Sequence, residues 1–266
     1  GIFGWVNESL IIHIFDLLSK YCYSFGFGII ILLLTLIIKL ALSPFTYKAF
    51  LSQAKMKVLK PEIDNITEKN KGKDQMKIQQ ETMALYRKAG VNPMGGCLPM
   101  LFQFPILIAL FQFFPASIEL RQQSFLWADD LSSYDSIYNF GFNIPFYGDH
   151  ISLFTLLMTI STLLYTRMNS SMATGPMAQM KWIMYLMPIL FLGIFNDMAA
   201  GLTYYYFLAN VFTMTQQYFM TRLVDENAIL AQIEANKKKP AKPKSKFQKK
   251  LEEMQKQQEQ KMKKRK

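Results

Sequence analysis

The sequence predicts an all-α, polytopic membrane protein with a core of five membrane-spanning helices. The chain of 266 residues is 51% hydrophobic, yet its mean hydropathy is only +0.10, because long uncharged runs alternate with stretches dense in Lys. Five of these runs meet or approach the roughly 20 apolar residues that a helix needs to cross about 30 Å of hydrocarbon. The net charge of +11 therefore indicates a membrane protein with basic cytoplasmic parts and not a basic soluble domain.

Residues 1–20 are the first expected element, an amphipathic helix. Ser9, His13, Asp16 and Lys20 recur at spacings of four, three and four, which places them in one polar stripe among apolar residues. We expect this helix to lie in the outer membrane interface with its apolar side in lipid. Packing on the helix bundle, or on an upstream domain outside this chain, is the alternative. Because the chain starts at Gly1, we also expect it to be a fragment or a processed chain.

The five spans are expected at residues 21–47, 94–118, 151–168, 182–198 and 201–223. A short turn joins the last two, and Gly201 is expected to ease it. Ten Lys and Arg lie between the first and second spans, whereas only Arg121 lies between the second and third. The positive-inside rule then places residues 48–93, the loop 169–181 and the C-terminus in the cytoplasm. The N-terminus and the loop 119–150 face outward.

Residues 48–93 are expected to form a cytoplasmic helical hairpin that turns at residues 70–74. Met56, Leu59, Ile63 and Ile66 follow a three-four-three spacing, which makes a narrow apolar seam along one helix. Because the seam is short, we expect the hairpin to be mobile.

Residues 224–266 are expected to be a basic cytoplasmic tail without a core of its own. From residue 225 onward the tail has 14 Lys and Arg against six acidic residues, so we expect it to be disordered alone. It either acts as a solvated topology and solubility tail or binds a polyanion, such as anionic lipid or ribosomal RNA. The candidate ribosome or lipid contacts are Arg222, Lys237, Lys238 and Lys239.

No arrangement of residues predicts enzyme chemistry. The chain has no GxSxG, no HExxH and no Gly-rich phosphate loop, and no pair of carboxylates falls inside a span, which argues against intramembrane proteolysis. Cys22 and Cys97 lie beside or within apolar runs, and His13 and His150 are far apart. We therefore expect no disulfide, catalytic residue, metal or cofactor.

Lys39 is the charge inside the first span, in the stretch LLLTLIIKLALSPFTYK. A charge at the centre of a membrane helix costs roughly 2.5–3.5 kcal/mol. Snorkelling toward Tyr47, about 12 Å away along the helix, is one explanation. The other is a hydrated groove, because a dry core would make further polar groups costly. Each such group alone indicates an interhelical hydrogen bond, but together with Lys39 they favour the groove. They are Thr35, Gln103, Tyr205, Tyr206 and Asn210, followed by Gln216 and Gln217 toward the cytoplasmic end of the fifth span.

Five stretches of the chain resemble, in order, the YidC family of membrane protein insertases. They are TLIIKLALSPFTYK, KMKVLKPEI, ALYRKAGVNPMGGCLPMLFQFPILIALF, ELRQQSFLWADDLS and GLTYYYFLANVFTMTQQ. The resemblance covers essentially residues 1–223, and its NPxGGCxPxxxQxP run is highly specific. Full-length relatives in Gram-negative bacteria carry an extra N-terminal span and a large periplasmic domain, which this chain would follow.

The resemblance implies an inner-membrane protein with a hydrophilic groove that is open to the cytoplasm and to lipid. Relatives usually carry Arg in the groove where this chain has Lys39, and Thr35, Gln103 and Tyr206 match groove-lining positions. Lys keeps the charge but lacks the planar fork of Arg, which favours simple electrostatic attraction over a fixed carboxylate clamp. The second and fourth spans, at 94–110 and 182–194, would form the apolar surface along which a substrate helix leaves for lipid.

The expected function is therefore that of a membrane protein insertase and chaperone, acting alone or with the Sec translocon. Its expected partners are nascent membrane proteins, the ribosome, the Sec translocon and membrane lipids. Two other classes stay open from the residues. One is an anion-binding transporter or channel that uses Lys39, although nothing in the chain resembles an inverted repeat with broken half-helices. The other is a lipid-binding scaffold that uses the amphipathic helix and the basic tail.

Overall fold

The computed structural model describes residues 7–70, 75–92, 95, 98–170 and 181–238. The N-terminal elements are a short π-helix at Asn7–Ile12, α2 at His13–Cys22, a 3₁₀ turn at Tyr23–Phe25, α3 at Phe27–Ala41 and α4 at Ser43–Val58. They are followed by α5 at Lys60–Lys69, α6 at Gln75–Ala89, α7 at Leu98–Ala116 and a 3₁₀ turn at Ile118–Leu120. The remaining elements are β1 at Tyr138–Ile144, β2 at Gly148–Ile151, α8 at Leu153–Ser170, α9 at Lys181–Asn196, α10 at Ala200–Leu223 and α11 at Glu226–Lys238.

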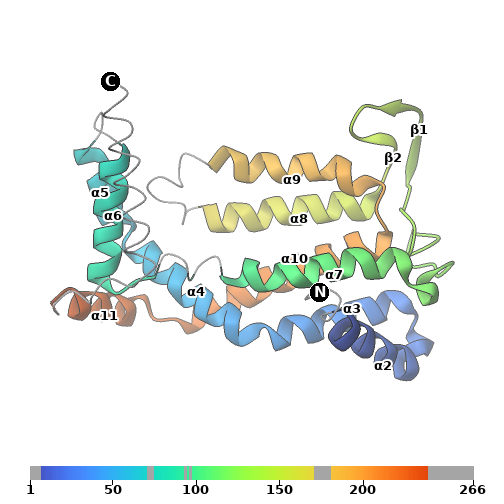
Figure 1. Cartoon of the computed structure of the whole chain (residues 1–266), viewed down its shortest axis with the longest axis horizontal. Helices are drawn as coiled ribbons and strands as arrows, with labels where there is room; N and C mark the ends of the chain where they lie inside the picture. The colour runs from blue at the N-terminus through green and yellow to red at the C-terminus, as the bar shows by residue number, and fades with distance from the viewer. Residues whose placement is uncertain (1–6, 71–74, 93–94, 96–97, 171–180, 239–266) are drawn as a thin grey trace.

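A bundle of long helices forms the body of the molecule. α3, α7, α8, α9 and α10 lie along the same direction, and α10 contacts α8, α3 and α7 (Figure 1). These helices are apolar and pack through a core in which Leu34, Leu110, Phe114 and Tyr205 are fully buried. Each overlaps one of the ranges where a span is expected, but the expected span 21–47 is divided among the end of α2, a 3₁₀ turn, α3 and the start of α4.

Length and composition alone single out one candidate span among the described helices. No single described helix is both long enough and apolar enough to cross a membrane, but α3 and α4 are so together, as a pair bent by 59°. Shorter apolar helices lie at Gln103–Ala116 and Trp182–Asn196. The number of crossings therefore stays a prediction.

The loop between α7 and α8 contains a β-hairpin, which corrects the all-α expectation. β1 and β2 pair antiparallel through Tyr138↔Ile151, Asn139↔His150 and Ile144↔Gly148, with a shift of register between the last two pairs. The sequence YNFGFNI of β1 alternates aromatic with Asn or Gly residues, which is the period-two pattern of a strand. The fold is therefore mainly helical with one β-hairpin (Figure 1).

Gly201 does not make the turn expected of it. The residue lies inside α10, and its φ is not positive. A Cβ added there would lie 2.8 Å from Cδ1 of Phe114 and 3.0 Å from the carbonyl oxygen of Leu131. Glycine at this position therefore permits close packing of α10 against α7 and the loop that follows α7.

The N-terminal helix packs on the bundle. Ile11, Phe15 and Leu18 are buried in the same core as α3 and α7, and the Phe15 ring lies 5.0 Å from that of Phe113 in an edge-on contact. This is the arrangement named as the alternative to an interfacial helix. Leu17 points outward and is 57% exposed, so an apolar surface remains on the outer side of α2.

A second, smaller core joins the helical hairpin of residues 48–93 to α11 at the start of the tail. Ile229 and Ile233 of α11 are buried against Leu59 and Ile63 of the hairpin. Glu226–Lys238 of the expected tail therefore forms a helix docked on the hairpin, because two isoleucines four residues apart form an apolar stripe that the hairpin covers. Disorder of the tail alone stays a prediction. Most of the expected hairpin turn, and residues 239–266, lie outside the described residues.

Candidate functional site

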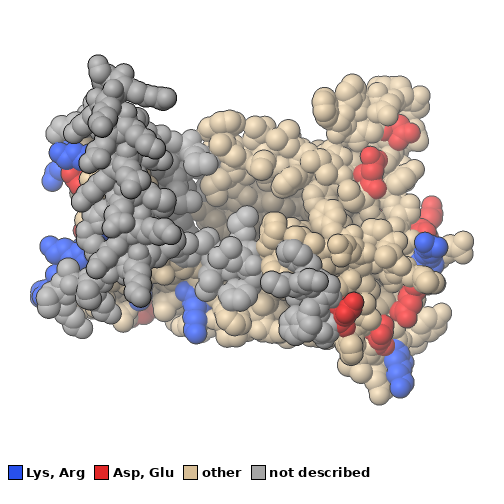
Figure 2. All heavy atoms as spheres, viewed as in Figure 1, with Lys and Arg blue, Asp and Glu red and all other residues tan. Residues whose placement is uncertain are grey.

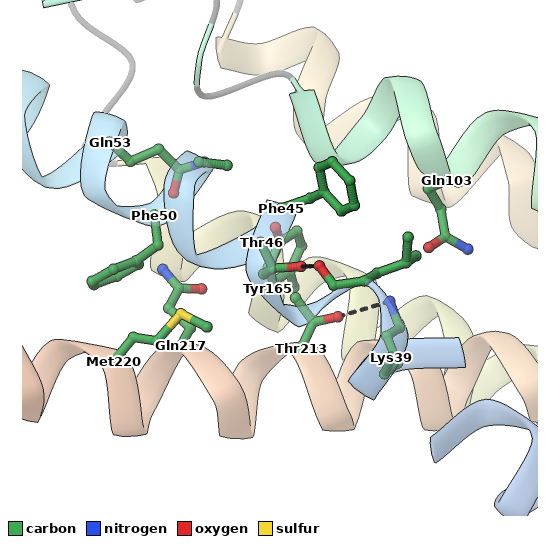
Figure 3. Close-up of a pocket in the computed structure, with 12 residues that line it drawn as sticks. Lys39, Phe45, Thr46, Phe50, Gln53, Gln103, Tyr165, Thr213, Gln217 and Met220 are labelled. Atoms are coloured by element: carbon green, nitrogen blue, oxygen red, sulfur yellow. Dashed lines mark hydrogen bonds between the residues drawn. The ribbon is translucent and has the colours of Figure 1, made fainter. Parts of the chain in front are cut away.

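A bend in the first apolar segment positions the candidate site. α3 ends at Ala41, and α4 begins at Ser43 with Pro44 in its first turn. Proline has no backbone N–H and fixes φ, which suits the start of a new helix and not the continuation of the old one. The 59° bend turns the last turn of α3, with Lys39, and the first turn of α4, with Thr46, toward one space beside α10 (Figure 3).

This space is a pocket of about 60 Å³ lined by side chains of α3, α4, α7, α8 and α10. Its apolar walls are Leu42, Phe45, Ala49, Phe50 and Met220. Its polar lining comprises Lys39, Thr46, Gln53, Gln103, Tyr165, Thr213 and Gln217. A cation and neutral hydrogen-bonding groups therefore share a site that five helices assemble.

Lys39 is held by a neutral partner. Its Nζ donates to Oγ1 of Thr213 at 3.0 Å, and Thr213 in turn donates to the carbonyl oxygen of Ala209 at 2.7 Å (Figure 3). On the backbone side, Nε2 of Gln216 donates to the carbonyl oxygen of Lys39 at 3.4 Å. Within the described part of the chain, no carboxylate lies within 4.0 Å of Nζ. The ammonium is thus oriented but has no neighbouring countercharge.

Gln103 supplies a second donor on the α7 side of the pocket. Its Nε2 is buried and has no hydrogen-bond partner among the residues that the structure describes. Gln217, across the pocket on α10, donates instead to Oδ1 of Asn169 at 2.9 Å. A cation and an unsatisfied amide donor suit a ligand that offers acceptors, such as a carboxylate or the carbonyl groups of an extended chain.

The structure separates the six groove residues expected from the sequence. Lys39 and Gln103 line the pocket, but the other four do not. Thr35 is buried and donates to the carbonyl oxygen of Ile31 in its own helix at 2.7 Å. Asn210 donates to Thr162 of α8 at 2.8 Å and so joins two helices.

Tyr205 and Tyr206 belong to the aromatic packing of the bundle. The Tyr205 ring lies 6.4 Å from that of Phe114, and the Tyr206 ring lies 6.2 Å from that of Phe195. Both hydroxyl groups are buried, and that of Tyr205 lies near the side chain of Gln103. A groove-lining role for these tyrosines, and for Thr35 and Asn210, stays a prediction.

Several polar residues of the pocket were not predicted as site residues. Gln217 is one of the polar residues named above for the fifth span, and Thr213 lies four residues before it on the same face of the helix, so helical periodicity was a signal for Thr213. Gln53, Thr46 and Tyr165 carry no such signal. They reach the pocket only through the bend after α3 and the packing of α8 on α10.

The predicted basic contacts differ in their surroundings. Arg222 is exposed and donates to the hydroxyl of Tyr218 at 3.2 Å. Lys237 forms an ion pair with Glu62 of the hairpin, whereas Lys238 is exposed. Lys239 lies outside the described residues. Contact of these four residues with a ribosome or lipid stays a prediction.

α9 presents an apolar surface beside the bundle. Leu186, Ile189, Leu190 and Ile194 are all exposed, and they lie three, one and four residues apart along the helix. Such a broad, uncharged helix face is typical of a surface that contacts lipid or another apolar helix.

Comparisons with known proteins agree over most of the chain. Residues 17–228 match the family described as 60Kd inner membrane protein. The chain is 50% identical over 263 residues to the membrane protein insertase YidC of Parabacteroides distasonis, and 52% identical over 262 residues to that of Bacteroides fragilis. Each match covers 96% of this chain but only 41% and 42% of those relatives. A crystal structure of an active YidC insertase with its first transmembrane domain resolved matches with a TM-score of 0.58 and 28% identity, over 81% of this chain and 47% of that one.

Proposed function

This chain belongs to the family described as 60Kd inner membrane protein, and from that premise we propose that it is the core of a membrane protein insertase and chaperone of the bacterial inner membrane. The observation that carries the proposal is Lys39, a cation with no carboxylate within 4.0 Å among the described residues, in a pocket that other polar groups line within an otherwise apolar bundle. The names of the similar insertases support the same activity.

Lys39 would attract the acidic end of a nascent segment. At 4 Å and an effective dielectric constant of 20, two opposite unit charges attract each other by about 4 kcal/mol. A neutral hydroxyl of Thr213 holds the ammonium in the free state, so a substrate carboxylate can replace it without breaking an ion pair. The attraction is modest and reversible, which allows the segment to leave.

Partition into lipid would complete insertion without nucleotide. Each square ångström of apolar surface that leaves water contributes about 25 cal/mol, so the burial of one apolar helix outweighs the attraction to Lys39. The exposed apolar face of α9, together with α7, would guide the segment out of the bundle. The segment is thereby held briefly at the pocket and released toward lipid.

The charge distribution supports a cytoplasmic hairpin and an outward N-terminus. On the face seen in Figure 2, most visible Lys and Arg lie at the end formed by α4, α5 and α11. Most Asp and Glu lie at the opposite end, with α2 and the β-hairpin. By the positive-inside rule the former end would be cytoplasmic. There the hairpin would receive nascent chains, and the basic tail would approach the ribosome beside the Sec translocon.

Complementation of a depleted strain tests the role of the charge. The variants are Lys39→Ala, Lys39→Gln and Lys39→Arg in the full-length protein, with Lys77→Gln, exposed on α6, as the control for loss of one Lys. Two substrates that differ only in an acidic or a neutralised outer tail separate attraction from other effects. We expect Lys39→Ala and Lys39→Gln to impair insertion of the acidic substrate, and Lys39→Arg and Lys77→Gln to support it. Full insertion of that substrate by Lys39→Ala would refute the proposal.

A further inference from the structure

A second pocket lies at the opposite end of the bundle, between α2 and the segment that follows α7. Its volume is about 510 Å³. Asp16, Ser19 and Lys20 line it from α2, and Glu119 and Arg121 line it from the segment after α7. Figure 2 shows acidic and basic side chains together at this end of the molecule. The pocket shares no residue with the one around Lys39.

The pocket has two charges of each sign, and they do not neutralise one another by contact. Among the described residues, no ion pair within 4.0 Å joins Asp16 or Glu119 to Lys20 or Arg121. Glu119 instead accepts a hydrogen bond from Oγ of Ser19 at 3.0 Å, which fixes one carboxylate on the wall. Opposite charges separated by open space complement a ligand that itself has both charges. Because the four formal charges sum to zero, a ligand of one sign gains little net attraction.

The rim of this pocket is apolar and aromatic. Tyr23 and Ile118, which line the pocket, are 66% and 80% exposed, and Tyr21 and Phe25, two residues to either side of Tyr23 in the chain, are 72% and 68% exposed. Exposed aromatic side chains beside charged ones are typical of the headgroup depth of a membrane protein. The apolar helix α3, in which Lys39 lies in the last turn, begins immediately afterwards at Phe27, which also lines the pocket. A water-soluble ligand has no need of such a rim, whereas a lipid has acyl chains to place against it.

We propose that this pocket binds the headgroup of a zwitterionic phospholipid with a primary ammonium, of the phosphatidylethanolamine type. Lys20 and Arg121 would contact the phosphate, and Asp16 and Glu119 would accept hydrogen bonds from the ammonium. A quaternary choline has no N–H to donate, and phosphatidylglycerol has no cation, so both bind less tightly. The bound lipid would join α2 to the segment after α7. The proposal depends on the membrane placement given above but not on insertion itself.

Native mass spectrometry of the full-length protein, delipidated in detergent, tests the proposal. The protein is titrated with phosphatidylethanolamine, phosphatidylcholine or phosphatidylglycerol, and the apparent Kd of the first bound lipid is measured. We expect phosphatidylethanolamine to bind about tenfold more tightly than either other lipid, since hydrogen bonds to charged groups are among the strong ones. Soluble phosphoethanolamine should not displace it at equal concentration. Displacement at equal concentration would indicate a site for a small soluble ligand and overturn the proposal.

Paired variants assign the binding to this pocket. Asp16→Asn with Glu119→Gln should weaken phosphatidylethanolamine binding about tenfold and leave phosphatidylcholine binding unchanged, which removes the selectivity. Lys20→Gln with Arg121→Gln should weaken binding of all three lipids. Lys77→Gln, a charge change on the hairpin, should have no effect. A thermal midpoint equal to that of the wild type shows that a variant is folded.

Two results would overturn the proposal. The first is an affinity for phosphatidylglycerol that equals the affinity for phosphatidylethanolamine and persists in the Asp16→Asn, Glu119→Gln variant. The pocket would then be a general anion site. The second is unchanged phosphatidylethanolamine affinity in both paired variants. Lys39→Ala should retain lipid binding, so failure of the insertase proposal and failure of this one give different results.

Discussion

Asp135 is a buried carboxylate on which the start of α8 depends. The residue is 1% exposed, and four donors surround it. Nε1 of Trp127 lies 2.8 Å from Oδ2, the backbone N–H groups of Leu153 and Phe154 lie 2.8 and 3.1 Å from the same oxygen, and the hydroxyl of Ser152 donates to Oδ1. Leu153 and Phe154 begin α8, so Asp135 satisfies amides that have no partner within the helix and lies at the positive end of its dipole.

Asp135→Ala should therefore be strongly destabilising. Hydrogen bonds to a charged group contribute about 1.5–3 kcal/mol each, and buried donors left without an acceptor cost about 1–3 kcal/mol each. The donors share one acceptor group and can relax in part, so we expect a loss of about 4 kcal/mol in the free energy of unfolding. Asp135→Asn keeps an acceptor for the donors at Oδ2 and should cost about 1–2 kcal/mol.

The thermal midpoint in detergent, followed by tryptophan fluorescence, measures this effect. The ring of Trp127 lies 4.4 Å from that of Phe154, so its emission reports on the start of α8. A loss of 4 kcal/mol corresponds to a decrease of about 10 °C. Asp129→Ala, an exposed aspartate of the same loop, is the matched control and should change the midpoint by less than about 2 °C. A midpoint for Asp135→Ala equal to that of Asp129→Ala would refute the capping role.

Three other predictions concern packing and charge. Gly193→Ala should lower the thermal midpoint, because the added Cβ would lie 2.0 Å from the backbone oxygen of Phe146; an unchanged midpoint would contradict this contact. Ile233→Asp should release α11 so that limited proteolysis cuts within residues 226–238, whereas the exposed Leu230→Asp should leave α11 protected; equal protection in both variants would argue against docking. Burial alone raises the pKa of Asp130, but hydrogen bonds from Ser132 and the nearby Arg121 lower it overall, below 3.8. Its contribution to stability is therefore present above about pH 5 and is lost as the pH falls through the lowered pKa. Asp130→Asn should therefore reduce the decrease of the thermal midpoint between pH 5 and pH 3.

The helical framework follows from patterns within single segments. Long uncharged runs predicted the ranges of α3, α7, α8, α9 and α10, and the five quoted stretches indicated a family that the comparisons confirm. The β-hairpin was missed, although the alternation in YNFGFNI indicates a strand. The docking of α11 was missed because Ile229 and Ile233 are only two apolar residues in a basic segment. Their significance depends on the hairpin that covers them.

The sequence by itself determined the family, the mainly helical class and the presence of one cation inside an apolar segment. A run of apolar residues around Lys39 identifies that cation without any knowledge of its neighbours. Only the tertiary structure decided which polar groups share its pocket. Thr213 and Gln53 line the same pocket as Lys39 because α3 and α4 form a pair bent by 59° that packs beside α10. Asn210, on the same helix as Thr213, turns instead to α8. Periodicity places residues on a face of their own helix, but the rotation of one helix against another depends on the packing of the whole bundle.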